Sequence, residues 1–362
     1  MRICVVGGMI DAKLHSKIAP LQHSTLIHEI HLVRRLPYQG DKIIAHSVPR
    51  WIRTFLPAAE LWRLLQLTWI CLRHRPRLLI AFGTMPHGLY IWLVGKLFRI
   101  KTIQHIMGKN DLRLTFNKQR GRKLAMRAVV AADLVAVRGR PMIKMLVQKG
   151  VEKTRIFVPQ NIHDFSLFHC TNPSPPEYEL IYVGLLSRYK RIDLLLQSFA
   201  ASSPASSEAK LLIVGDGPEK QALQQLAEQL EISSRVDFVG KIPFEQLPAY
   251  YCNARTFIMT SQGEGLPMAM IEAMSCGLPV IIANDADITE IANHEHNALV
   301  VNHWTAHDFS HAIVRMRQDA KLYQHLRQNA LQLRTSHQTE YSLDFQTRLW
   351  TEHIQSLFKP VT

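Results

Sequence analysis

The sequence has few cysteines, and their placement is unlike that of a small disulfide-rich or zinc-binding domain. There are five, an odd number, and no two form a Cys-x-x-Cys pair: Cys4, Cys71, Cys170, Cys252 and Cys276. A disulfide framework or a zinc cluster would show closer, paired spacings. We therefore expect no disulfide and a reducing compartment. The chain also opens on a strand-like run, residues 2–6, without the layout of a signal peptide, which predicts a cytoplasmic protein.

Long uninterrupted hydrophobic runs are lacking as well. Eighteen uncharged residues separate Arg77 from Lys96, enough for a membrane-spanning helix, but a loop-forming sequence from Gly83 to Gly88 lies in their middle. We predict a strand, a loop and a helix there. No repeat or low-complexity tract occurs. With 362 residues, 47% hydrophobic and 20% charged, the composition is that of a globular protein of about two domains.

Acidic residues are scarce in the first half of the chain. Residues 1–170 contain 28 Lys and Arg against 8 Asp and Glu, whereas residues 171–362 contain 15 against 21. A basic half could face nucleic acid, an anionic lipid surface or a phosphorylated substrate, and charge alone does not choose among them.

Short apolar runs alternate with helix-compatible segments throughout, which predicts an α/β protein with parallel sheets covered by helices. The proline-rich stretch 171–178 divides two such series. We expect two doubly wound Rossmann-like domains facing a central cleft, with a first domain over 1–170, a linker over 171–178, a second domain over 179–335 and a helical end over 336–362. The expected strands lie near 2–6, 42–47, 78–82, 101–106, 133–137, 155–159, 179–184, 210–215, 236–239, 255–260, 279–283 and 298–301.

The segment 260–280 carries the strongest chemical signal. A strand ends near Ser261, Gly263 and Gly265 permit a tight loop, and Pro267 suits the first position of a helix. The backbone amides from Gly265 and Leu266 onward would then meet an anion such as a diphosphate at the helix N-terminus.

Two acids in this segment, Glu264 and Glu272, are eight residues apart. A diphosphate would repel a carboxylate, so these side chains are better suited to accept hydrogen bonds from sugar hydroxyls. Such a pair suits a nucleotide sugar. The alternative is that Glu264 is a solvated loop residue and Glu272 a helix-surface acid.

This segment resembles the Glu-x7-Glu motif of family 4 retaining glycosyltransferases, which have the GT-B fold with a C-terminal helix returning to the first domain. The resemblance is continuous from about residue 180 to 301. Further matching pieces are Tyr182-Val183-Gly184, Lys190, residues 214–218, Phe238-Val239-Gly240, residues 277–280 and Glu290.

The resemblance implies roles for individual residues. Glu264 would contact the donor sugar and Glu272 the ribose. Gly265 and Leu266 would contact the diphosphate, and Gly240 and Lys241 are further candidates for donor binding. Gly7 and Gly8, which end the first strand, could bring backbone close to the acceptor or the donor phosphate.

The family also places cations on the diphosphate. Leu185 stands where the family has an arginine, Lys190 is retained, and Arg188 would substitute for the missing arginine because the leaving diphosphate needs a fixed cation. The alternative is that Arg188 is an exposed loop residue.

Two histidines follow strands in the first half. By resemblance, His105 would lie near the donor sugar and line the acceptor side, with His87 as a second candidate; a structural role is the alternative for each, as packing is for Gly7 and Gly8. Asp285 and Asp287 could hold a divalent cation, but helix capping is the interpretation we favour. We expect no metal site.

The segment 50–77 mixes tryptophan, leucine and arginine, a combination that suits a water–lipid boundary. The alternative is a core helix with a solvated basic edge. Basic residues at 118–127 could extend the same surface.

Together these observations predict a retaining, metal-independent glycosyltransferase without a cofactor. The donor would be a nucleotide diphosphate sugar, with a UDP-sugar favoured over a GDP-sugar. The acceptor would be a saccharide hydroxyl, most simply of a lipid-linked glycan in cell-surface polysaccharide or lipopolysaccharide synthesis. The protein would lie in the cytoplasm or on the cytoplasmic face of the membrane.

Three alternatives are weaker. A non-catalytic relative that binds a nucleotide sugar fits the loss of arginine at Leu185. A nucleic-acid-binding protein fits the charge but lacks a recognition module. A dehydrogenase would need a third glycine where Gln221 stands.

Overall fold

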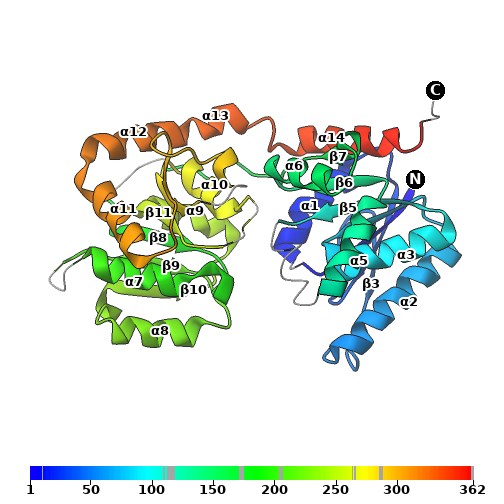
Figure 1. Ribbon diagram of the computed structural model, residues 1–362, viewed down its shortest axis with the longest axis horizontal. Helices are drawn as coiled ribbons and strands as arrows, with labels where there is room; N and C mark the ends of the chain where they lie inside the picture. The colour runs from blue at the N-terminus through cyan, green and yellow to red at the C-terminus, as the bar shows by residue number, and fades with distance from the viewer. Residues whose placement is uncertain are drawn as a thin grey trace. The chain divides into compact units, whose positions relative to one another are not determined.

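The chain forms two compact units in the computed structural model, which describes residues 1–9, 11–108, 111, 119–170, 175–203, 207–262, 264, 266–284 and 288–359. Unit 1 comprises residues 1–162 and 340–362, and unit 2 comprises residues 163–339 (Figure 1). Residues 163–170, expected in the first domain, thus pack with unit 2. Of the expected linker, 171–174 lie outside the described residues and Tyr178 already begins a strand.

Unit 1 is built on a seven-stranded sheet of order β3-β2-β1-β4-β5-β6-β7, in which every pair is parallel. Its central strands are apolar almost throughout because helices cover both faces. The strands are β1 (Arg2–Val6), β2 (Glu29–Arg34), β3 (Ile43–Ser47), β4 (Leu78–Phe82), β5 (Lys101–Ile106), β6 (Leu134–Val137) and β7 (Ile156–Phe157).

The two faces of this sheet bury different helices (Figure 1). One core cluster joins the sheet to α1 and α14, and includes Trp350 and Ile354 of α14. Another cluster joins the opposite face to α2 and α3. The helices of unit 1 are α1 (Asp11–His23), α2 (Leu56–His74), α3 (Leu89–Phe98), α5 (Gln119–Val130), α6 (Pro141–Gln148) and α14 (Leu343–Ser356).

Unit 2 repeats this plan with a six-stranded parallel sheet of order β10-β9-β8-β11-β12-β13. The chain turns back at β8 and β11, the topological switch point where such sheets bind ligands. The strands are β8 (Tyr178–Val183), β9 (Leu211–Val214), β10 (Val236–Gly240), β11 (Ala254–Met259), β12 (Val280–Ala283) and β13 (Ala298–Val301).

Two helices of unit 2, α11 and α12, begin at side-chain caps supplied by Thr305 and Asp319. The side chain of Thr305 accepts a hydrogen bond from the Asp308 amide, as its spacing to that residue predicts for a capping box. The helices are α7 (Ile192–Ser202), α8 (Lys220–Gln229), α9 (Leu247–Cys252), α10 (Met268–Ser275), α11 (Ala306–Gln318), α12 (Ala320–Leu331) and α13 (Leu333–His337).

The predicted strand, loop and helix between Arg77 and Lys96 are confirmed as β4, a short turn and α3. No helix among the described residues has both the length and the apolar character needed to cross a bilayer. One strand was missed: β2 contains Glu29, His31 and Arg34, and these polar residues conceal its apolar pattern although His31 is fully buried.

The expectation of no disulfide is wrong. Cys170 and Cys252 form a disulfide that ties the start of unit 2 to the end of α9. Their sequence separation of 82 carried no spacing signal, because the pairing depends on how the chain folds. Cys276 is buried as a free thiol.

Glycine allows the loops after β8, β9 and β10 to approach one another. Gly215 has φ +143°, and a Cβ there would lie 1.8 Å from the carbonyl oxygen of Gly184. At Gly217 a Cβ would lie 2.2 Å from the Leu186 carbonyl oxygen. The Gly215 amide donates to the Gly240 carbonyl at 2.8 Å. A side chain at Gly215 or Gly217 would therefore push these loops apart.

Gly215→Ala should destabilise unit 2 by about 2–4 kcal/mol, because the new methyl group meets backbone that cannot move aside. Native-state hydrogen exchange of peptides from β8 and β9 measures the loss. Gly240→Ala is the control: its φ is +76°, but only the flexible Lys220 ammonium lies within 4.0 Å, so strain of about 1–2 kcal/mol is expected. Equal losses in both variants would contradict the steric argument.

Candidate functional site

Two predicted site residues meet at the carboxyl edge of the unit 2 sheet. Lys190 follows β8 and Glu264 follows β11, and the lysine ammonium forms an ion pair with the glutamate carboxylate. The two side chains are only 13% and 14% exposed. Such a pair depends on mutual neutralisation, since either charge alone would pay a desolvation penalty.

Backbone contacts hold the two loops in register beside this ion pair. The Thr260 hydroxyl lies within hydrogen-bond distance of two carbonyl oxygens, 3.1 Å from that of Lys190 and 2.7 Å from that of Arg191. The Gln262 amide donates to the Tyr189 carbonyl at 3.1 Å. The ion pair is thus positioned by the adjacent strands β8 and β11.

Glu272 lies within α10 and is 7% exposed. Its carboxylate accepts a hydrogen bond from the Tyr251 hydroxyl at 2.9 Å. Burial raises the pKa of Glu272 to about 7, although the Tyr251 hydroxyl acts in the opposite direction. The carboxyl group therefore gains or loses its proton near neutral pH. An acid on the helix surface, the alternative interpretation, would be ionised at that pH.

Buried tyrosines accompany both acids. The Tyr182 hydroxyl donates to the Leu185 carbonyl at 3.1 Å, and burial together with the charge of Glu264 raises its pKa. Burial and the charge of Glu272 raise the pKa of Tyr251 in the same way. Sequence reasoning missed Tyr251, because nothing near it in the chain reveals a partner 21 residues away.

The remaining predicted donor contacts lie around the same strand ends. Leu266 is buried and precedes α10, which begins at Met268, so Pro267 caps the helix instead of occupying its first turn. Gly240 ends β10 and Lys241 follows it with an exposed side chain. Gly265, Asp285 and Asp287 lie outside the described residues.

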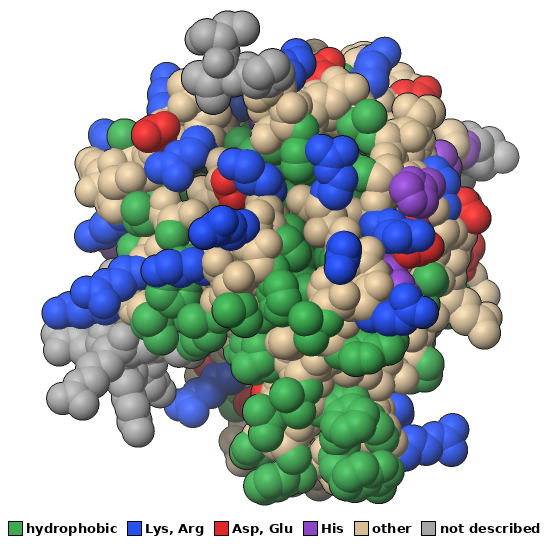
Figure 2. Space-filling view, turned by 90° about the vertical axis from the view of Figure 1, so that its right-hand side faces the viewer, with side chains coloured by type: hydrophobic (Ala, Val, Ile, Leu, Met, Phe, Trp, Pro, Cys, Tyr) green, Lys and Arg blue, Asp and Glu red, His purple; other side chains and the backbone are tan. Residues whose placement is uncertain are grey.

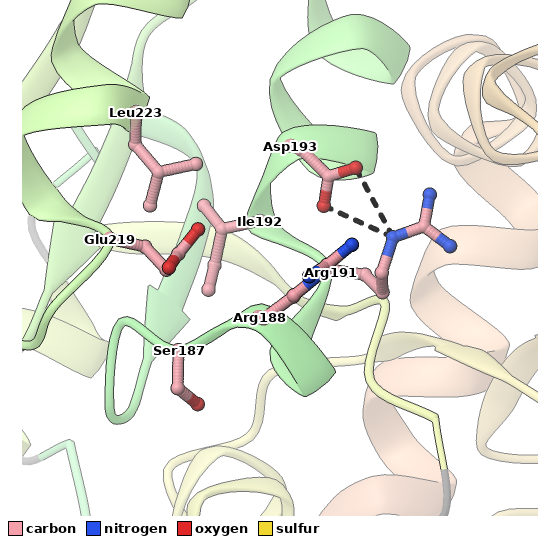
Figure 3. Close-up of a pocket in the computed structure, with 7 residues that line it drawn as sticks. All are labelled: Ser187, Arg188, Arg191, Ile192, Asp193, Glu219 and Leu223. Carbon is pink, nitrogen blue, oxygen red and sulfur yellow. Dashed lines mark hydrogen bonds and ion pairs between the residues drawn. The ribbon is translucent and has the colours of Figure 1, made fainter.

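Arg188 lines a separate cavity of about 460 Å3 beside α7 and α8 (Figure 3). Arg191 lines one side of the cavity, and its Nε donates hydrogen bonds to the two carboxylate oxygens of Asp193 at 3.1 and 3.2 Å. Glu219 adds an acidic side chain to the lining. Lys190 and Glu264 are not among the residues that line this cavity. The cavity is also lined by Ser187, Ile192 and Leu223.

In unit 1, Gly7 and Gly8 follow β1 and meet buried polar groups. The buried Arg63 of α2 donates to the Gly7 carbonyl at 2.9 Å and pairs with Glu60 at 2.9 Å. His87 packs beside Gly8, where a Cβ would lie 3.1 Å from its ring. The His87 ring lies 3.0 Å from the Phe82 carbonyl oxygen, and burial lowers its pKa to about 3.

His105 is buried in β5, with 2% of its surface exposed, and its ring packs near Phe82 and Trp350. Neither ring nitrogen has a hydrogen-bond partner among the residues that the structure describes. Burial lowers the pKa of His105 well below its usual value, so the ring is neutral. Unsatisfied buried nitrogens are uncommon in proteins.

A protein-family match covers most of unit 2, which contains the Lys190–Glu264 ion pair and Glu272. Residues 170–333 match the family model described as glycosyl transferases group 1. Unit 2 carries a glycosyl transferases group 1 domain.

Two curated relatives add to this comparison, and the match to the first of them is longer than the group 1 domain. N-acetyl-alpha-D-glucosaminyl L-malate synthase from Bacillus anthracis is 23% identical over 80% of this chain and 78% of its own length. O-antigen chain mannosyltransferase B from Escherichia coli is 34% identical over 31% of this chain and 30% of its own length. The chain spans about a third of the length of most curated relatives it matches.

The fold has solved counterparts. Anabaena Alr3699/HepE in complex with UDP-glucose superposes with a TM-score of 0.79 at 17% identity, covering 98% of this chain and 100% of that one. The predicted α/β class with two Rossmann-like domains of the GT-B type is thereby confirmed. The group 1 domain corresponds to the second of these domains.

Burial of the Glu272 carboxyl group makes the stability of the protein depend on pH. The pKa of Glu272 is higher in the folded protein than in the unfolded chain, so the protonated carboxyl group favours the folded state. This contribution to the free energy of unfolding is fully present below about pH 4.5 and is lost as pH rises through about 7. The loss approaches about 3 kcal/mol. Urea unfolding at several pH values should show a larger loss of stability with rising pH in the parent than in Glu272→Gln; the buried histidines His87 and His105, whose pKa values are lowered, add a slope of opposite sign to both proteins.

The matched control is Glu228→Gln, an exposed acid on α8. It should keep the slope of the parent protein. A slope in Glu272→Gln equal to that of the parent would show that another group causes the loss.

Proposed function

We propose that the protein is a retaining, metal-independent glycosyltransferase. It moves a sugar from a UDP-sugar to a hydroxyl of a lipid-linked saccharide in cell-surface polysaccharide or lipopolysaccharide synthesis. The relative that bears the O-antigen name supports this class of acceptor.

The observation that carries the proposal is the Lys190–Glu264 ion pair within a glycosyl transferases group 1 domain. A diphosphate placed beside this pair would draw the ammonium of Lys190 toward its oxygens. Glu264 would then be free to accept hydrogen bonds from the sugar hydroxyls. One pair thus provides both a cation for the leaving group and an acceptor for the sugar.

The reaction breaks the bond between the sugar anomeric carbon and the diphosphate oxygen, and forms a bond from that carbon to the acceptor oxygen. The acceptor proton passes to the departing phosphate. Negative charge grows on the diphosphate in this step, so Lys190 and Arg188, which lie on the same short turn after β8, would stabilise it. Retention of configuration rests on the family resemblance, with attack from the face that the diphosphate leaves.

The buried acid would act at the ribose end of the donor. Glu272 would accept hydrogen bonds from the ribose hydroxyls beside Tyr251. A role for His105 on the acceptor side rests on the family resemblance alone, because the residue is only 2% exposed.

A second candidate, a nucleotide-sugar-binding protein without transfer activity, is favoured by one observation. Leu185 is 50% exposed where the family has its arginine, and Arg188 lines a different cavity. Both candidates predict binding of UDP-sugars. Only the enzyme releases UDP from them.

Glu264→Ala should reduce release of UDP from a UDP-hexose by about 100-fold or more, because its contact is to the sugar. Binding of UDP alone should weaken by about threefold or less. Calorimetric titration with UDP and a UDP-release assay over a panel of UDP- and GDP-hexoses measure the two effects, with Glu228→Ala as the control on α8.

Equal losses in binding and turnover would contradict the role of Glu264. Binding without UDP release by the parent protein, with acceptor extracts supplied, would favour the non-catalytic candidate. Preference for GDP-hexoses would overturn the UDP assignment.

The proposal that the acceptor is lipid-linked is supported by a second apolar face of α2. The helix buries Leu67 and Ile70 against the sheet, yet a row of large apolar side chains on its other side is more than half exposed. This row, the exposed apolar row, consists of Leu61, Leu65, Trp69 and Leu72, at spacings of four, four and three residues.

Exposed apolar and basic residues surround this row. Trp51 and Phe55 are 78% and 64% exposed at the start of α2, and Leu97 on α3 is 70% exposed. Figure 2 shows hydrophobic side chains gathered over the lower part of this face, with Lys and Arg along their borders. Apolar side chains bordered by cations suit an anionic lipid surface. The exposed cations near the helix ends are Arg50, Arg73, Arg75, Arg77, Lys96 and Arg99.

Flotation with vesicles of phosphatidylglycerol should capture the parent protein at low salt, and high salt should release it. Leu61→Glu with Leu65→Glu should abolish capture, because two carboxylates would enter the anionic surface. Val147→Glu, at an exposed position on α6, is the control. Capture that is unchanged in the double variant would contradict a role for the exposed apolar row.

A further inference from the structure

Three histidines and a glutamate meet in unit 1, beside Trp69 of the exposed apolar row. Glu29 and His31 lie on one face of β2, His46 lies on the adjacent strand β3, and His74 is the last residue of α2. The rings of His31 and His74 are 4.3 Å apart, and those of His31 and His46 are 5.3 Å apart. Segments separated by up to 45 residues therefore place their titratable groups together.

The ligand atoms of Glu29, His31 and His74 all lie within 4.8 Å of one another. Two imidazole nitrogens and one carboxylate oxygen are a ligand set that Zn2+ accepts, with a fourth position left for water. The described residues hold one other such group, which consists of cysteines in unit 2. We propose that Glu29, His31 and His74 bind a Zn2+ ion.

His31 is oriented for this role. It is fully buried, so its ring cannot rotate freely. Its Nε2 faces a Glu29 carboxylate oxygen at 2.8 Å, and its Nδ1 faces His46 Nε2 at 3.0 Å. A ligating histidine commonly holds its second nitrogen in such an outer hydrogen bond. His46 therefore acts as a positioning residue, and a bound ion replaces the proton between His31 and Glu29.

Groups around the three proposed ligands carry both negative and positive charge, which respectively favour and oppose a bound cation. His74 ends α2, and the negative end of that helix dipole favours a cation. Arg2 opposes the ion, since its Nε lies 3.0 Å from the same Glu29 oxygen that faces His31. The Arg2 side chain is 50% exposed, so it can turn toward water when the ion binds. Removing Arg2 should thus strengthen the site.

The position of the cluster indicates a structural role. His74 closes α2 and Glu29 opens β2, whereas Gly7 follows the carboxyl end of β1 at the opposite edge of the sheet. A bound ion would connect the end of α2 to the start of β2 and thereby raise the unfolding temperature of the protein. It would take no part in the transfer reaction.

The experiment uses untagged full-length protein with its disulfide intact, dialysed against chelator and then into buffer without reductant. Titration with Zn2+ against a chromophoric chelator should show one equivalent bound. Titration with Co2+ should give the visible bands of tetrahedral coordination. Cu2+ should quench part of the tryptophan fluorescence, because Trp69 lies 5.4 Å from the His74 ring.

The variants His74→Ala and Glu29→Gln should weaken Zn2+ binding by about 100-fold or more and remove the Zn2+-induced rise in unfolding temperature. Glu29→Gln keeps the shape of the side chain and tests the charge alone. Arg2→Gln should tighten binding roughly two- to fivefold. His15→Ala, an exposed histidine on α1, should bind as the parent does.

Other outcomes overturn the proposal. Absence of a bound equivalent would do so, as would binding that survives both His74→Ala and Glu29→Gln. Binding lost in Cys276→Ser instead would assign the ion to the cysteines of unit 2. Weak binding of several equivalents would show an adventitious ion only.

Discussion

The close approach of loops at the carboxyl edge of the second sheet is the constraint on which the site depends. A Cβ at Gly215 would fall 1.8 Å from the Gly184 carbonyl, so only glycine lets the loops after β8 and β9 pack together. The β8 loop then reaches the loop after β11, where Lys190 meets Glu264. The pairing of the two charges is a consequence of backbone packing.

Burial sets the chemistry of the acidic groups that this edge carries. Glu264 shares its environment with a cation, whereas Glu272 has a tyrosine hydroxyl, and burial raises its pKa to about 7. Two carboxylates eight residues apart thereby have different partners, an ammonium for Glu264 and a tyrosine hydroxyl for Glu272.

Unit 1 differs from unit 2 in what its helices expose. Helix α2 has one apolar face toward the sheet and the exposed apolar row on its other side. The end of the same helix carries His74 into the histidine cluster. One helix thus combines core packing, a surface suited to lipid and a ligand for a cation.

The α/β class and, among the residues that the structure describes, twelve of the thirteen strands could be predicted from local patterns, because apolar runs follow from short stretches of chain. The same local patterns indicated Glu264 and Glu272 as candidates. The tertiary structure alone decided the rest. The disulfide of Cys170 with Cys252, the partner of Glu272, the pairing of Lys190 with Glu264 and the polar strand β2 all depend on contacts between distant residues. No local spacing encodes them, since burial and partner choice exist only once the sheets have formed.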